Sequence, residues 1–191
     1  MGRSSSEHAL MDIVLVHPQI PHNTGCAARL AAALQLPLHL VEPLGFSLED
    51  RYLKRAGLDY WPKVALHVHA DIEAAFEALA VGSERPLEER LKLFSARGGA
   101  SLFDTDFAAD DVLLFGSETA GLPSGLLEAH ADQRVYIPVD PGVRSLNLAN
   151  VVCLGAYTAM DRSGSALPAN DGAHVPTPEG ASITPIDRIQ S

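Results

Sequence analysis

Several classes of protein are excluded by what this chain of 191 residues contains little of. Only two cysteines are present, which excludes a fold held together by several disulfides. No apolar run reaches the roughly 20 residues that span a bilayer, and the first residues lack the apolar core of a signal peptide. We therefore expect a cytoplasmic protein without a membrane partner.

Basic residues are also scarce, since 14 Lys and Arg face 24 Asp and Glu and give a formal net charge of -10. This negative charge argues against a protein that binds nucleic acid through its overall electrostatic potential. If RNA is a partner, it must bind a local basic patch. Charge alone favours an enzyme that acts on small molecules.

Three familiar ligand-binding and catalytic motifs are missing as well. The first strong apolar run, residues 12–16, leads into His-Pro-Gln-Ile-Pro-His-Asn-Thr-Gly. A dinucleotide fold would have Gly-x-Gly-x-x-Gly at this place. The chain also lacks a Gly-x-x-x-x-Gly-Lys phosphate loop and a Gly-x-Ser-x-Gly nucleophile elbow. A dinucleotide-dependent oxidoreductase is therefore disfavoured.

What the sequence does contain is an alternation of short apolar runs with helical patterns, which is typical of strand-helix-strand units with a parallel sheet. We predict strands at 12–16, 38–42, 64–68, 91–95, 111–115 and 134–138, and helices at 25–35, 47–57, 71–81, 124–129 and 145–161. The domain is expected to cover 11–162. We expect a flexible extension at 1–10 and a disordered tail, rich in Pro, Gly and Ser, at 163–191.

The last predicted helix is apolar on all its sides, which requires burial on all its sides. Two arrangements satisfy this requirement. A second subunit packs against the helix, or the helix lies in the centre of a monomer. The pattern fits both equally.

Three glycine-bearing segments follow predicted strands, at the edge of the sheet where open α/β folds bind ligands. They lie at 23–29, 114–123 and 137–150. In this order they resemble the three signature motifs of the SpoU branch of the SPOUT RNA 2'-O-methyltransferases. The phrases Val-Glu-Pro-Leu-Gly-Phe and Arg-Ala-Gly-Leu-Asp-Tyr, at 41–46 and 55–60, are similar to the TrmL subfamily. The resemblance covers about 11–162.

The resemblance implies an α/β fold of the SPOUT type, with a mostly parallel six-stranded sheet, helices on both faces and a C-terminal trefoil knot. General rules of chain topology would not predict a knot. It also implies a homodimer that uses S-adenosyl-L-methionine to methylate the wobble nucleotide, cytidine or uridine 34, in the anticodon stem-loop of tRNA. Two alternatives stay open: methylation of another tRNA position or of rRNA, and RNA binding without catalysis.

The resemblance also assigns site residues. Arg29 matches the catalytic arginine, Asn147 matches a position in the active centre, and Glu118 is a third candidate. The matching cofactor-binding positions are Ala96, Gly116, Ile137, Ser145 and Leu146. A guanidinium is a poor base, so we expect Arg29 to stabilise the ribose alkoxide and hold a phosphate. Without the resemblance, Arg29 would be read as a surface arginine, Glu118 as a solvated carboxylate, and Ser145 as the N-cap of the last helix.

A local basic patch could bind RNA even though the net charge of the chain is negative. Arg51, Lys54 and Arg55 have the spacing i, i+3 and i+4, which places them on one face of a helix. With Arg29 and Arg144 they make a candidate track for the RNA backbone. The usual meaning of such a run is a solvated helix face.

Two positions depart from the subfamily pattern. Ala120 stands where arginine is common, and Ser-Ala-Arg-Gly at 95–98 replaces a threonine-rich phrase. His67 and His69 alternate on a predicted strand and share a face, but no further ligands complete a zinc site in the sequence. We therefore predict no metal.

Overall fold

The structure is a computed structural model that describes residues 10–48, 63–81 and 83–169. The predicted helix 47–57 falls almost entirely outside this part, and so do Arg51, Lys54 and Arg55. The same holds for nearly all of the predicted N-terminal extension and for most of the predicted tail. Ser163 and Ser165, at the start of that tail, donate their backbone N–H groups to carbonyls of the last helix.

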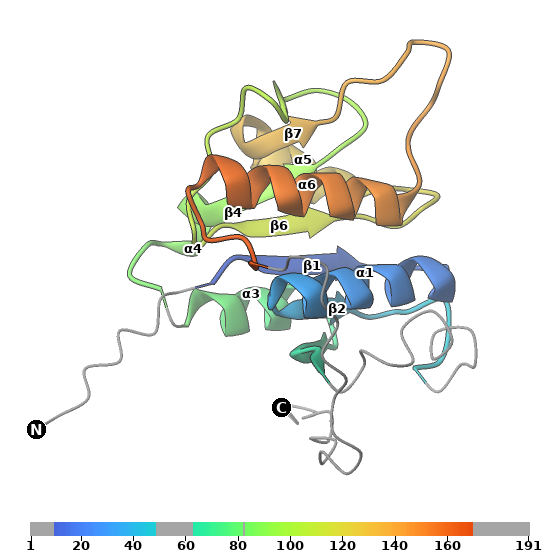
Figure 1. Ribbon diagram of the computed structural model, residues 1–191. Helices are drawn as coiled ribbons and strands as arrows, with labels where there is room; N and C mark the ends of the chain where they lie inside the picture. The colour runs from blue at the N-terminus through green and yellow to red at the C-terminus, as the bar shows by residue number, and fades with distance from the viewer. Residues whose placement is uncertain (1–9, 49–62, 82, 170–191) are drawn as a thin grey trace, which may run out of the picture.

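The described chain contains both strands and helices (Figure 1). The strands are β1 Asp12–Val16, β2 Leu38–Val41, β3 Leu66–His69, β4 Leu91–Phe94, β5 Ala100–Ser101, β6 Val112–Phe115 and β7 Arg134–Tyr136. The helices are α1 Pro21–Leu34, α3 Ile72–Ala80, α4 Leu87–Arg90, α5 Ser124–Ala129 and α6 Leu148–Arg162, with a 3₁₀ turn at Ala131–Gln133.

The strands form one sheet in the order β3-β2-β1-β6-β4-β7-β5. Every neighbouring pair is parallel, which confirms the predicted parallel α/β class. The predicted count of six is wrong, because the described sheet has seven strands. The additional strand, β5, has only two residues, Ala100 and Ser101, and is too short to produce an alternating pattern in the sequence.

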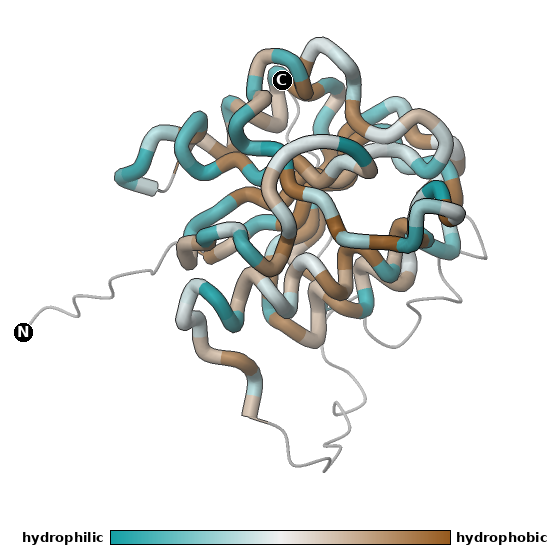
Figure 2. The backbone as a smooth tube through the Cα atoms, turned by 90° about the horizontal axis from the view of Figure 1, so that it is seen from above, coloured by the Kyte–Doolittle hydropathy of each residue, from teal (hydrophilic) through white to brown (hydrophobic). Residues whose placement is uncertain are grey.

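Helices cover both faces of the sheet, because successive strand residues point to opposite sides. Ile13 and Leu15 belong to a core cluster with residues of α1 and α6, whereas Val14 and Val16 belong to a second cluster with residues of α3 and α4. The predicted helices on both faces are therefore confirmed. Figure 2 shows the hydrophobic segments gathered toward the middle of the molecule, with hydrophilic segments in the outer turns.

Two helix starts differ from the prediction. Helix α1 begins at Pro21, ahead of the predicted 25, because proline is well suited to the first position of a helix. Helix α6 begins at Leu148, and its N-cap is Asn147, whose side-chain oxygen accepts a hydrogen bond from the Ala149 N–H at 2.9 Å. The interpretation of Ser145 as the N-cap is thus wrong, because the asparagine two residues later satisfies the free amides.

Helices α1 and α6 lie side by side on one face of the sheet (Figure 1). Val152, Ala156 and Ala159 of α6 are fully buried against this core. On its other side, Leu154 and Tyr157 are 36% and 43% exposed. A single copy of the chain therefore leaves one apolar side of the predicted all-round helix uncovered. Among the described helices, none has the length and hydropathy needed to cross a bilayer.

Candidate functional site

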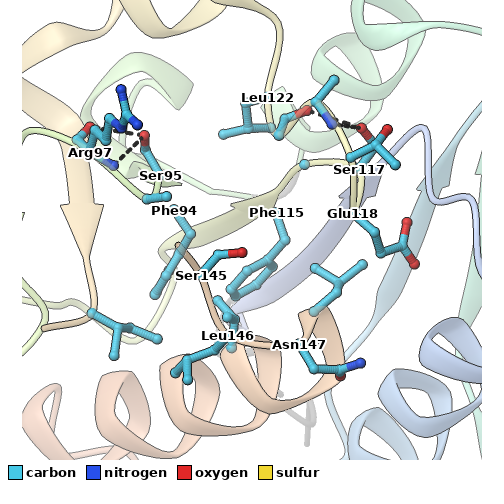
Figure 3. Close-up of a pocket in the computed structure, with 18 of the residues that line it drawn as sticks. Phe94, Ser95, Arg97, Phe115, Ser117, Glu118, Leu122, Ser145, Leu146 and Asn147 are labelled. Carbon is cyan, nitrogen blue, oxygen red and sulfur yellow. Dashed lines mark hydrogen bonds between the residues drawn. The ribbon is translucent and has the colours of Figure 1, made fainter. Parts of the chain in front are cut away.

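A cavity of about 790 Å³ opens at the carboxyl ends of β4, β6 and β7. Its walls are the segments that follow these strands, at 95–97, 116–122 and 137–147, together with the starts of α1 and α6. Open α/β sheets bind ligands at this edge, and the volume lies within the range of small-molecule sites. Figure 3 shows the lining side chains between the strand ends and α6.

Most of the site residues predicted from the sequence meet at this cavity. Those that line it are Ala96, Gly116, Ile137, Ser145, Leu146, Glu118, Asn147 and Arg144. Arg29 is exposed on α1 and is not among the lining residues. Arg51, Lys54 and Arg55 lie outside the described residues, so the predicted basic track is represented only by Arg29 and Arg144.

Glu118 ties the loop after β6 to the chain just ahead of α1. One carboxylate oxygen accepts the Gln19 N–H at 2.8 Å, and the other accepts the Ile20 N–H at 3.1 Å and the Asn23 side-chain amide at 2.9 Å. Ile20 is the N-cap of α1 and its side chain forms no capping hydrogen bond. The Glu118 carboxylate accepts the Ile20 backbone N–H and adds negative charge near the N-terminus of the helix. Both oxygens are occupied, and Glu118 acts as a fixed acceptor.

Asn23 extends this connection to α6. Its side-chain oxygen accepts a hydrogen bond from the Asn147 amide at 2.9 Å, while its own amide donates to Glu118. Asn23 is only 3% exposed. One chain of hydrogen bonds thus joins three segments that are far apart in the sequence. We predicted Asn23 only as part of a motif, although a buried amide in the first turn of an apolar helix signals a partner.

The loop after β6 is shaped by two glycines. Ser117 and Gly121 exchange backbone hydrogen bonds of 3.1 and 2.9 Å, and Gly121 has a φ of +73°. A Cβ atom on Gly116 would lie 2.0 Å from the carbonyl carbon of Gly121 and 2.1 Å from the backbone nitrogen of Leu122. A side chain at position 116 would therefore overlap the backbone of the same loop, so glycine is required there independently of any ligand.

Two stacked phenylalanines form part of the cavity wall. In the sequence they look like ordinary strand ends, and no pattern predicts their role. The rings of Phe94 and Phe115, which end β4 and β6, have centroids 4.4 Å apart. A Cβ on Gly155 of α6 would lie only 2.8 Å from the Phe94 ring. The glycine therefore lets the helix approach the rings. Figure 3 shows Phe94 and Phe115 facing the same space as Leu146.

The histidines lie elsewhere, on the face of the sheet that α3 covers. His39 shares a 2.9 Å hydrogen bond with His69 and contacts an Asp12 carboxylate oxygen at 3.2 Å, while His67 stacks on His39. Burial, followed by repulsion from His39 and His67, lowers the pKa of His69 to about 4. Across the described residues, no set of three His, Cys, Asp or Glu side chains is arranged to hold a metal ion.

The chain is similar to known proteins over most of its length. The SpoU rRNA Methylase family matches residues 11–157. A tRNA (cytidine(34)-2'-O)-methyltransferase from Polaromonas sp. is 42% identical over 168 residues, which cover 87% of this chain and 96% of that protein.

Two solved structures share the fold. One, described as giving structural insights into the 2-OH methylation of C/U34 on tRNA, is 47% identical with a TM-score of 0.73, and the match covers 81% of this chain and 96% of that one. The other is the SpoU methyltransferase AviRb from Streptomyces viridochromogenes in complex with AdoMet. It is 25% identical with a TM-score of 0.66, and the match covers 83% of this chain and 60% of that one.

Proposed function

We propose, because this chain belongs to the SpoU rRNA methylase family, that it is an enzyme that methylates the ribose 2'-oxygen of the wobble nucleotide of tRNA, cytidine or uridine 34. One observation carries the proposal. The three glycine-bearing segments, which are distant in the sequence, meet around one cavity at the carboxyl edge of the sheet. Relatives that match nearly their whole length to this chain carry the name of this activity.

The methyl donor is S-adenosyl-L-methionine, and the residues around the cavity suit it. Ala96, Gly116, Ile137, Ser145 and Leu146 would hold it. The aromatic wall formed by Phe94 and Phe115 offers an apolar surface for a flat base, while the loops offer backbone groups for polar atoms. When bound, the donor supplies an activated methyl group on a sulfonium. AdoMet is present in the related AviRb structure.

The residues of this chain orient the ribose and stabilise its oxygen. A guanidinium donates hydrogen bonds and accepts none, so Arg29 donates to the 2'-oxygen as negative charge develops there, and to a neighbouring phosphate. Glu118 and Asn147 are positioning residues in this account. Through Asn23 they fix α1, and with it Arg29, relative to the loops of the cavity.

We also propose a homodimer formed through α6 and α1. Leu154 and Tyr157 leave an apolar side of α6 exposed in a single copy, and Arg29 does not line the cavity of its own copy. A second copy that covers α6 would bury the apolar side. It would also bring Arg29 toward the cavity of its partner.

A C-terminal trefoil knot is part of the same proposal. Strand β4 lies between β6 and β7, and after β7 the chain returns across the sheet so that α6 packs against α1 and β6. This path supports passage of the C-terminal segment through the loop formed by the preceding strands.

A tRNA substrate also favours a cytoplasmic enzyme.

Methyl transfer to defined tRNA tests the function. Purified protein and radiolabelled S-adenosylmethionine are incubated with a tRNA that has either a normal or a 2'-deoxy ribose at position 34. We expect label in the first tRNA and none in the second, because the second lacks the attacking oxygen. Equal labelling of both would place the reaction at another nucleotide. Absence of cofactor binding by calorimetry would make the protein a non-catalytic RNA-binding module.

A further inference from the structure

The rim of the cavity is positively charged although the chain as a whole is acidic. Three arginines line the cavity, Arg97, Arg134 and Arg144. Glu118 is the carboxylate among the described lining residues, and its oxygens already accept hydrogen bonds from three N–H donors. In a chain with a formal net charge of -10, this local excess of cations requires an explanation.

Four cations elsewhere in the described chain are paired with carboxylates. Arg85, Arg90, Lys92 and Arg162 each lie within 4 Å of an aspartate oxygen. Arg97 and Arg134 form no such ion pair with a described residue. The cations at the cavity are thus distinguished from the structural cations of the sheet.

The loop after β4 fixes the position of Arg97. The Ser95 hydroxyl donates to the Arg97 carbonyl at 2.9 Å and accepts from the Arg97 N–H at 3.2 Å. Gly98 and Gly99 follow with φ values of +74° and +97°. The turn therefore holds Arg97 at the rim while its side chain stays exposed (Figure 3).

Arg134 reaches the same turn from the start of β7. A Cβ on Gly98 would lie 3.3 Å from one terminal guanidinium nitrogen of Arg134, and a Cβ on Gly99 would overlap the Arg134 carbonyl. The Arg134 Nε–H donates to the Ala131 carbonyl at 3.1 Å, which orients the guanidinium plane. Gly98 thus leaves room for the guanidinium of Arg134 beside the turn that follows Arg97, and Gly99 leaves room for the Arg134 backbone.

We propose that Arg97 and Arg134 together bind an RNA phosphate next to the ribose that is methylated. This inference rests on the proposed function. Two neighbouring guanidinium groups match the geometry and charge of a phosphate, and phosphate contacts fix the register of a nucleic acid on a protein. The Ser-Ala-Arg-Gly phrase, which departs from the subfamily pattern, thereby acquires a role in holding the substrate.

Electrostatics favours a phosphate over the carboxylate of the cofactor as the bound group. The cofactor carries a sulfonium and an ammonium cation against one carboxylate, so its net charge is positive and uncompensated cations at the rim repel it. An RNA backbone that crosses the rim supplies an anion that compensates them. Binding of RNA and of the cofactor should therefore strengthen each other.

Single and double variants Arg97→Gln and Arg134→Gln test the inference, with Lys63→Gln as the control. Lys63 is an exposed cation that does not line the cavity. We expect each cavity variant to weaken tRNA binding about tenfold, the loss typical of one charge-assisted hydrogen bond. The salt dependence of tRNA binding should also become shallower by about 0.7–0.9 per lost phosphate contact. The control should bind tRNA like the wild type.

Calorimetry with S-adenosylmethionine alone distinguishes whether the two arginines bind an RNA phosphate or the carboxylate of the cofactor. We expect its affinity in the absence of RNA to be unchanged or higher in the variants. A loss of cofactor affinity with normal tRNA binding would assign the pair to the cofactor carboxylate and overturn the inference, as would normal binding of both. Arg97→Gln serves alone if Arg134→Gln unfolds. A wild-type protein that methylates no tRNA would refute the proposed function itself, whereas active variants with normal tRNA affinity would refute only this inference.

Discussion

Replacing Glu118 by glutamine should loosen the connection between the cavity and α1. The carboxylate accepts hydrogen bonds from Gln19, Ile20 and Asn23. A glutamine has one accepting oxygen, so in either orientation its NH₂ group faces at least one N–H donor. Hydrogen bonds to charged groups contribute about 1.5–3 kcal/mol each. Because Glu118 is partly exposed, water compensates some of the loss, and we expect a destabilisation of about 2 kcal/mol.

Urea unfolding of Glu118→Gln beside Glu128→Gln measures this effect. Glu128 is exposed on α5, and its substitution should change the free energy of unfolding by less than about 0.5 kcal/mol. In a methyl-transfer assay, Glu118→Gln should lower kcat more than it weakens tRNA binding, since the side chain positions α1 rather than contacting RNA. Equal unfolding free energies for wild type and Glu118→Gln would refute the assignment of Glu118 as the central acceptor.

Three further predictions concern packing and pH. Gly116→Ala should abolish cofactor binding in calorimetry, because its Cβ would overlap the backbone of the same loop. Gly155→Ala should destabilise the protein by about 1–3 kcal/mol in urea unfolding through contact with the Phe94 ring, whereas Gly125→Ala, which has open space around it, should be neutral or mildly stabilising. Burial, with repulsion from His39 and His67, lowers the pKa of His69 from its ordinary value of 6.5 to about 4 in the folded protein. Between these two pH values the unfolded chain binds a proton at this histidine more readily than the folded protein does. The contribution of neutral His69 to the free energy of unfolding should therefore be complete above pH 6.5 and fall as the pH drops toward 4. The fall should be smaller in His69→Leu. A pH-independent stability of the wild type over this range would contradict the burial of a neutral His69.

The sequence predicted the parallel sheet because the strands are continuous apolar runs buried on both faces. Its periodicity failed where elements were too short, as in β5, and where a local residue outweighed the pattern, as at Pro21 and Asn147. The candidate cofactor-binding residues were predicted from motifs, not from chemistry visible in any one of them. Geometry alone shows that they meet at one cavity.

Other parts of the site depend on contacts between distant segments, which a single sequence does not encode in any local pattern. The connection from Glu118 through Asn23 to Asn147 is of this kind. So is the approach of Arg134 to the turn that follows Arg97, where two glycines have positive φ. The histidines were predicted only in part. Their alternation predicted a shared face correctly, but the partners that explain them, His39 and Asp12, come from neighbouring strands.

Methylation of the ribose 2'-oxygen of the tRNA wobble nucleotide is tested most directly by nucleoside analysis of tRNA from cells that lack this protein. We predict that one 2'-O-methylated cytidine or uridine at position 34 disappears, while other 2'-O-methylated nucleosides stay at wild-type levels. The lost nucleoside should return when the wild-type gene is restored. An unchanged nucleoside profile at position 34 would contradict the proposed methylation of the wobble nucleotide.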